Sequence, residues 1–184
     1  RLRHKRYKPT LNVKNMAVEL ALRYGADPEK AALAALLHDA AKGLPPPEML
    51  QIFKENAIMA KNAEQRPFPV WHGIAAAILC MTRWGVADPE ILSAIECHTT
   101  GKVNMSLLDK VLYMADATSA ERDYPGVEQL RREQLQDLDL ATLHCMEQSI
   151  AVVRDKGGEL DPETVAACED LRRRIAGHTV RPNT

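Results

Sequence analysis

The sequence predicts an all-α protein, a compact helical bundle of the kind that a single domain spanning residues 1–184 would form. The tripeptide Asp-Pro-Glu occurs three times, beginning at Asp27, Asp88 and Asp161, and an apolar-periodic stretch follows each time. Aspartate accepts hydrogen bonds at a helix start, proline fits the first helical position, and glutamate suits the positive end of the helix dipole. Apolar spacings of three and four recur along the chain and strand signals are nearly absent, so helices are expected throughout.

The first predicted helix spans residues 10–24. It places Leu11, Val18 and Leu22 on one face, which is the spacing of a helix packed against a core. Gly25 follows immediately, and glycine is the residue most often found just after a helix end. We therefore expect an amphipathic helix that stops at Tyr24.

A second helix starts after Asp27 and carries the pair His38-Asp39 at its end. Three consecutive prolines at 45–47 prevent this helix from continuing and open a short one. Residues 56–70 show no helical periodicity, so a loop is expected there.

The second half of the chain repeats these signals. Its predicted helices cover residues 71–84 before Gly85, the stretch from Asp88 to His98, residues 106–119, residues 137–156 before Gly157 and Gly158, and a last helix that starts after Asp161.

Charge and composition exclude several classes of function. The formal net charge is -1 and the pI is about 6.7, which suggests neither a nucleic acid nor a membrane as partner. The N-terminal run RLRHKRYK, with five Lys or Arg in eight residues, fits either a solvated basic end or a phosphate contact. The sequence leaves a homodimer open.

The four cysteines are predicted to be free thiols. They show no CxxC spacing and no paired pattern, which favours a reducing compartment. Because no signal peptide and no membrane-length apolar run is visible, the expected location is the cytoplasm.

Histidines and carboxylates stand at helix ends or on apolar helix faces. They are His38 and Asp39 in LLHDAAKG, His72 in WHGIAAAILC, His98 at the end of ILSAIECH, and Asp116 in LYMADATSAER. Any one of them alone fits a surface or capping role. Together, in this order, they could converge in a helical bundle. Polar groups that are buried need partners, and converging side chains would supply them. Imidazole combined with carboxylate is the ligand chemistry of catalytic divalent metals.

The ordered set of HD, H, H and D resembles the HD-domain metal-dependent phosphohydrolases. KRYKPTLNV, LLHDAAKG, the WHG histidine, AIECHTTGK, LDKVLYMADATSAER and LDPETV are together similar to the YqeK-type symmetrical diadenosine tetraphosphate hydrolases. The similarity extends from about Lys5 to about Ala176. An HD-type all-helical fold is what this resemblance implies.

The resemblance implies a metal held by His38, Asp39 and Asp116, together with a histidine of the first helix. That family's metal is iron; zinc, manganese and magnesium remain open, and so does the number of ions, one or two. The chain departs from the family in its first motif, where Pro9 stands in place of the histidine and offers no donor.

The resemblance also implies nucleotide contacts. Those at the polyphosphate are Arg6, Lys42, His72, His98, Thr99 and Arg122, while Leu160, Asp161 and Pro162 belong to the segment 159–164 at the nucleoside end. A polyphosphate needs cations that neutralise its oxygens, which suits Arg6, Lys42 and Arg122. For the two later histidines, hydrogen bonds to phosphate are favoured over a second metal.

The implied reaction is metal-assisted hydrolysis of a phosphoanhydride, with a metal-activated water attacking in line with the leaving phosphate. Asp39 and His38 are the predicted catalytic residues, and the tetraphosphate would be cut in the middle into two ADP. Three alternatives stay open: a nucleotide-binding protein with weakened catalysis, an HD phosphohydrolase acting on another nucleotide, a phosphomonoester or an alarmone, and a purely structural helical protein.

Overall fold

Helices are the only regular elements that the computed structural model contains within the residues it describes, 4–179, with side chains described for 8–177. This confirms the all-α prediction. In chain order the elements are α1 (His4–Tyr24), α2 (Pro28–Leu37), α3 (Pro46–Glu55), α4 (Ala57–Ala60), the 3₁₀ turns η1 (Ala63–Gln65) and η2 (Phe68–Val70), α5 (Trp71–Trp84), α6 (Pro89–Cys97), α7 (Leu107–Thr118), α8 (Val127–Glu133), α9 (Leu138–Asp155) and α10 (Pro162–Thr179).

The predicted caps form. Asp27, Asp88 and Asp161 each accept a hydrogen bond from the backbone amide two residues later, at 2.8, 2.9 and 2.9 Å. Ser106 begins α7 with a capping box, in which its hydroxyl and the Asp109 carboxylate each bond the other's backbone amide. The amides at these helix starts are therefore satisfied by the side chains that the sequence supplies.

The structure differs from the sequence prediction at three places. Helix α1 begins at His4 and not at residue 10, so Pro9 lies inside it. A proline inside a helix removes one backbone hydrogen bond, and its ring crowds the carbonyl four residues earlier. Residues 56–70 form α4, η1 and η2 instead of a plain loop, with Lys61 and Asn62 in the left-handed conformation between the turns. Helix α8 was not predicted, since seven residues are too few for a periodic pattern.

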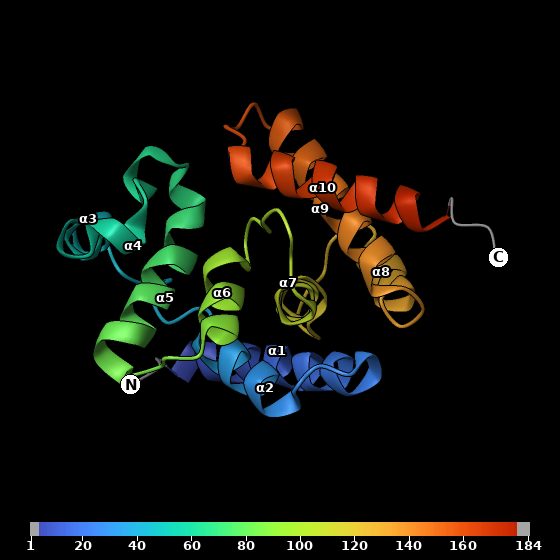
Figure 1. Ribbon diagram of the computed structural model, residues 1–184, viewed down its shortest axis with the longest axis horizontal. Coiled ribbons are helices and arrows are strands. Elements are labelled where there is room, and N and C mark those ends of the chain that lie inside the picture. The colour runs from blue at the N-terminus through green and yellow to red at the C-terminus, as the bar shows by residue number, and fades with distance from the viewer. Residues whose placement is uncertain (1–3, 180–184) are drawn as a thin grey trace.

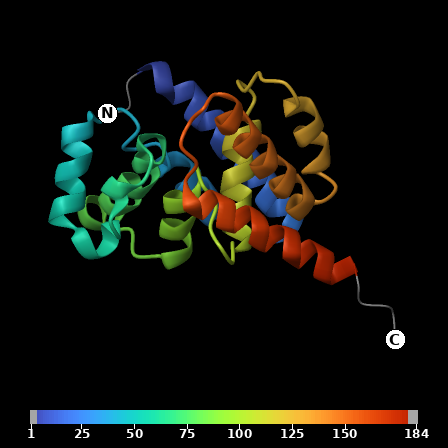
Figure 2. The ribbon, with the colours of Figure 1, turned by 90° about the horizontal axis from the view of Figure 1, so that it is seen from above.

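Helix α7 lies at the centre of the fold and appears nearly end-on in Figure 1. It packs against α1, α2, α6, α8 and α9. Figures 1 and 2 show α3–α5 gathered at one end of the molecule and α8–α10 at the other, with α1, α2, α6 and α7 between them.

Small side chains let the central helices approach closely. Ala17, Ala34, Ala75 and Ala94, from four different helices, are fully buried. The four cysteines are buried and form no disulfide, as predicted. None of the helices described has both the length and the hydropathy to cross a bilayer. That all 184 residues form a single domain stays a prediction.

Candidate metal centre

Five of the predicted site residues converge where helix ends meet. His38 caps the C-terminus of α2 and Asp39 follows it, His72 lies in the first turn of α5, His98 caps α6, and Asp116 lies in the last turn of α7. Each of these helices packs its apolar residues into the shared core, which brings the helix ends that carry the site residues together. The bundle therefore brings together residues that lie up to 78 positions apart in the sequence.

Two overlapping groups of possible metal ligands result. In the first group, which contains His38, His98 and Asp116, the His38 Nε2 atom lies 3.6 Å from Asp116 Oδ1. It also lies 3.6 Å from Asp39 Oδ2. In the second group, Asp39 Oδ1 lies 3.4 Å from His72 Nε2 and 3.7 Å from His98 Nε2, and the two histidine Nε2 atoms are 3.2 Å apart.

Backbone contacts hold the three imidazoles in place. The Nδ1 atoms of His38, His72 and His98 lie 2.6, 3.0 and 2.7 Å from the carbonyl oxygen three residues earlier in the chain. Because a carbonyl can only accept a hydrogen bond, each Nδ1 carries the proton. The Nε2 atoms, which face the centre, are then left with a lone pair in the neutral ring, the form that binds metal.

The donor set fits a divalent metal. His38 Nε2 and Asp39 Oδ1 are buried and have no hydrogen-bond partner among the residues that the structure describes. Leaving such atoms unpaired in the core is costly. Ligand bonds of about 2.0–2.2 Å place neighbouring ligand atoms about 3 Å or slightly more apart, close to the distances found here. A cation bound in this cluster would satisfy the orphaned nitrogen of His38.

Charges within the cluster set its protonation. Burial raises the pKa of Asp39, but the neighbouring imidazoles of His72 and His98 outweigh this, so its pKa lies well below the usual range. Burial also raises the pKa of Asp116, but the contact with His38 outweighs this effect and lowers the pKa. Burial lowers the pKa of His98. At neutral pH the centre therefore presents two ionised carboxylates and a neutral His98.

Two of the predicted phosphate contacts border the centre. Lys42 Nζ lies 2.8 Å from Asp39 Oδ2, and Arg122 Nη2 lies 2.6 Å from Asp116 Oδ1. The side chains remain 43% and 37% exposed, so both cations are accessible from solvent. Each metal-facing carboxylate thus has a basic residue on its outer side.

Gly73 positions two of the histidines. A Cβ atom at this residue would lie 2.9 Å from the Glu96 carbonyl oxygen and 3.3 Å from His98 Nδ1. Helix α5 can approach α6 this closely only because residue 73 has no side chain. The glycine after His72 is visible in the sequence, but this packing role is not.

Gly73→Ala is expected to separate the two helices and so weaken metal binding as well as the fold. Overpacking of this kind costs roughly 1–3 kcal/mol. The matched control is Gly177→Ala in α10, where a new Cβ meets nothing within 4 Å and alanine is expected to be neutral or stabilising. Chemical denaturation and metal titration of both variants test this. A Gly73→Ala protein with unchanged metal affinity would contradict the positioning role.

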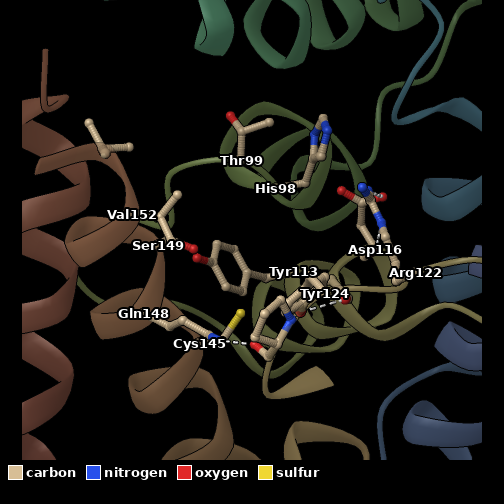
Figure 3. Close-up of a pocket in the computed structure, with 13 residues that line it drawn as sticks. His98, Thr99, Tyr113, Asp116, Arg122, Tyr124, Cys145, Gln148, Ser149 and Val152 are labelled. Carbon is tan, nitrogen blue, oxygen red and sulfur yellow. Dashed lines mark hydrogen bonds and ion pairs between the residues drawn. The ribbon is translucent and has the colours of Figure 1, made fainter. Parts of the chain in front are cut away.

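A pocket of about 520 Å³ adjoins the metal centre. Figure 3 shows its two sides: His98, Thr99, Asp116 and Arg122 on one, and residues of α9 on the other. The α9 side includes Cys145, Gln148, Ser149 and Val152, and Tyr113 and Tyr124 also line the pocket. The Tyr124 hydroxyl donates to the Ala117 carbonyl at 2.8 Å, which fixes that ring against the pocket. Sequence reasoning missed this pocket, because the spacing of residues in α9 does not show that this helix faces Tyr113.

The structure places the other predicted site residues as follows. Thr99 lines the pocket, and its buried hydroxyl has no hydrogen-bond partner among the described residues. Asp161 caps α10 and binds Arg66 through both carboxylate oxygens, at 2.7 and 2.8 Å. Leu160 packs against the core and Pro162 begins α10, and neither lines the pocket beside the metal centre. The side chain of Arg6 lies outside the described residues.

Comparisons with known proteins find relatives that match most of the chain. A family model described as "HD domain" matches residues 6–121. The "Bis(5'-nucleosyl)-tetraphosphatase, symmetrical" of Bacillus subtilis (strain 168) is 38% identical over 86% of this chain and 85% of its own. The protein of the same name from Halalkalibacterium halodurans is 34% identical over 90% and 88%. A crystal structure of a "predicted HD superfamily hydrolase involved in NAD metabolism" from Clostridium acetobutylicum has a TM-score of 0.85 at 39% identity, covering 94% of this chain and 92% of its own.

Proposed function

This chain belongs to the HD-domain family, and we propose from that premise that it is a metal-dependent phosphohydrolase that cleaves diadenosine tetraphosphate symmetrically into two ADP. The observation that carries the proposal is the cluster of His38, Asp39 and Asp116 beside a pocket of about 520 Å³, with Lys42 and Arg122 at its border. Pockets for small organic ligands commonly measure about 300–1,000 Å³, so a nucleoside fits. The named relatives act on the same substrate class.

His38, Asp39 and Asp116 would hold the metal. A bound divalent ion supplies an activated water and withdraws charge from a phosphate oxygen. The free Oδ1 of Asp39 would accept a hydrogen bond from the attacking water and orient it. Lys42 and Arg122 would neutralise the phosphate oxygens from the solvent side. The Tyr124 ring would face the base inside the pocket.

Several finer assignments remain proposals. Iron as the metal, and Arg6 and residues 160–162 as nucleotide contacts, rest on the sequence resemblance. His72 and His98 stay candidates for hydrogen bonds to phosphate. The expected partner is the nucleotide substrate; the absence of nucleic-acid and membrane partners, the homodimer and the cytoplasmic location stay predictions.

Product analysis tests the function. The purified protein, freed of metal and then supplied with Fe²⁺, Mn²⁺ or Zn²⁺, is incubated with diadenosine tetraphosphate and the nucleotides are separated by chromatography. ADP as the only product is expected. ATP with AMP would contradict symmetrical cleavage. Binding of ADP without hydrolysis under any of the metals would favour the alternative of a nucleotide-binding protein, which Pro9 suggests.

Pro9→His is expected to raise both metal content and turnover. Pro9 lies on the same face of α1 as Val13 and Ala17, which are buried in the core. A histidine there adds a donor and restores a backbone N–H to the helix. Metal analysis and turnover measured across a metal titration check this. Unchanged metal content together with unchanged turnover would contradict it.

Lys42→Ala is expected to weaken ADP binding by roughly 1.5 kcal/mol, the lower end of the range for a charged hydrogen bond, since the side chain is 43% exposed to solvent. Adenosine, which lacks phosphate, should bind equally well to both proteins. Calorimetry with the two ligands measures the difference. Lys54→Ala, an exposed lysine on α3, controls for net charge. Equal losses for ADP and adenosine would show that Lys42 shapes the fold and not the phosphate site.

A further inference from the structure

Arg122 lies in the segment that connects α7 to α8, just beyond the end of α7. Its Nε donates to the backbone carbonyl of Asp116 at 2.8 Å, and its Nη2 lies 2.6 Å from Asp116 Oδ1. The guanidinium therefore folds back over the last turn of α7. Because these contacts span only six residues, the direction of the Arg122 side chain depends on how the backbone turns directly after the helix.

Arg131 of α8 holds that turn through three backbone carbonyls. Its Nε donates to the carbonyl of Thr118 at 3.0 Å. Its Nη2 donates to the carbonyls of Ser119 and of Arg122 itself, both at 2.8 Å. The remaining nitrogen, Nη1, pairs with Glu128. One guanidinium thus ties the end of α7, whose last carbonyls have no partner within the helix, to the residue that carries the phosphate-facing cation.

Helix α8 gives Arg131 a fixed base. Gln134, which follows α8, is buried, and its Oε1 accepts a hydrogen bond from the Thr118 hydroxyl at 2.9 Å. The Gln134 carbonyl accepts a second bond, from the Tyr24 hydroxyl of α1, at 2.5 Å. Helix α8 also packs against α7 and α9. The position of the Arg131 guanidinium is therefore set by three neighbouring helices.

The two arginines have different surroundings. Arg122 lines the pocket beside the metal centre and its side chain is 37% exposed, whereas Arg131 does not line the pocket and is 22% exposed. Arg131 contacts Arg122 through the backbone only. It can therefore influence a ligand in the pocket through the placement of Arg122.

We propose that Arg131 is a positioning residue for phosphate binding, which fixes the backbone at Arg122 and so holds the Arg122 guanidinium ready for the polyphosphate. The inference rests on the proposed function, in which Arg122 binds phosphate. A side chain that is already ordered loses less conformational freedom when its ligand binds. Lysine cannot take this role, because a single ammonium group does not reproduce the planar fork that reaches three carbonyls.

A double-mutant cycle on ligand binding tests the proposal. Calorimetry measures the affinity of ADP and of adenosine for the full-length protein supplied with Mn²⁺, in the wild type, Arg131→Ala, Arg122→Ala and the double variant. Arg131→Lys keeps a cation near the C-terminus of α7, where it favours the helix dipole. Arg132→Ala, which removes an exposed arginine from the same helix, is the control for net charge. Thermal unfolding monitors the fold of every variant.

Arg131→Ala is expected to lower ADP affinity about tenfold, within the range over which neighbouring residues couple, and to leave adenosine affinity unchanged. In the Arg122→Ala background the same substitution should have no further effect on ADP, because Arg131 acts through Arg122. Arg131→Lys should remain folded and still bind ADP as weakly as Arg131→Ala. Arg132→Ala should bind both ligands like the wild type.

Three results would overturn the positioning role alone, provided that Arg122→Ala weakens ADP binding. They are unchanged ADP affinity in Arg131→Ala, losses that add in the double variant, and full ADP affinity in Arg131→Lys, which would show that a helix-end cation suffices. Equal losses for ADP and adenosine in Arg131→Ala would also contradict it, since Arg131 would then support the pocket as a whole. Unchanged ADP affinity in Arg122→Ala would instead refute the phosphate role of Arg122 in the proposed function, and the role of Arg131 with it.

Discussion

Asp39→Ala is expected to lower the turnover of diadenosine tetraphosphate by at least about 10²–10³-fold, the loss seen when a single transition-state stabilising donor is removed from an enzyme. The two carboxylate oxygens of Asp39 face three histidines, Oδ2 toward His38 and Oδ1 toward His72 and His98. Alanine removes a ligand and the hydrogen-bond acceptor for the attacking water in one step. Steady-state hydrolysis at saturating metal is the measurement.

The helical fold of Asp39→Ala should persist. Asp39 lies in the turn after α2, and its carboxylate contacts polar groups and not the apolar core. Circular dichroism and thermal unfolding check this, with Asp155→Ala, an exposed aspartate at the end of α9, as control. Turnover near that of the wild type would show that Asp39 is not catalytic. An unfolded variant would instead mean that the His38-Asp39 pair is structural.

The residues of the candidate metal centre could be predicted from the sequence because each lies near a helix end that local signals define. Apolar periodicity and the caps fix where α2, α5, α6 and α7 start and stop, so His38, His72 and His98 could be placed at helix termini. Their convergence follows once four such helices share one core. The resemblance to a family then supplied the chemistry.

Features that depend on contacts between residues far apart in the sequence could not be predicted. The pocket joins Tyr113 of α7 to Ser149 of α9, and periodicity alone does not reveal which helices become neighbours. For the same reason Asp161 could be predicted as a cap, but its bond to Arg66, 95 residues earlier, could not.

The Arg66–Asp161 pair leads to the largest expected effect on stability. Both carboxylate oxygens of Asp161 accept hydrogen bonds from the guanidinium, and the two side chains are 3% and 21% exposed. Removing one member of a buried pair leaves the other charge without compensation, which costs about 3–5 kcal/mol. Arg66→Ala is therefore expected to lower the free energy of unfolding by about 3 kcal/mol, because Arg66 retains some exposure.

Urea denaturation measures this loss, and Arg83→Ala, an exposed arginine on α5, is the control. The double variant Arg66→Ala/Asp161→Asn should recover part of the stability, because asparagine still caps α10 but leaves no buried charge. ADP affinity separates the two roles open to Asp161. A structural pair predicts reduced stability with ADP binding unchanged in the folded variant. If Asp161 instead serves the nucleoside, as the sequence resemblance implies, Arg66→Ala should weaken ADP binding while costing less than about 1 kcal/mol of stability, the range of an exposed ion pair.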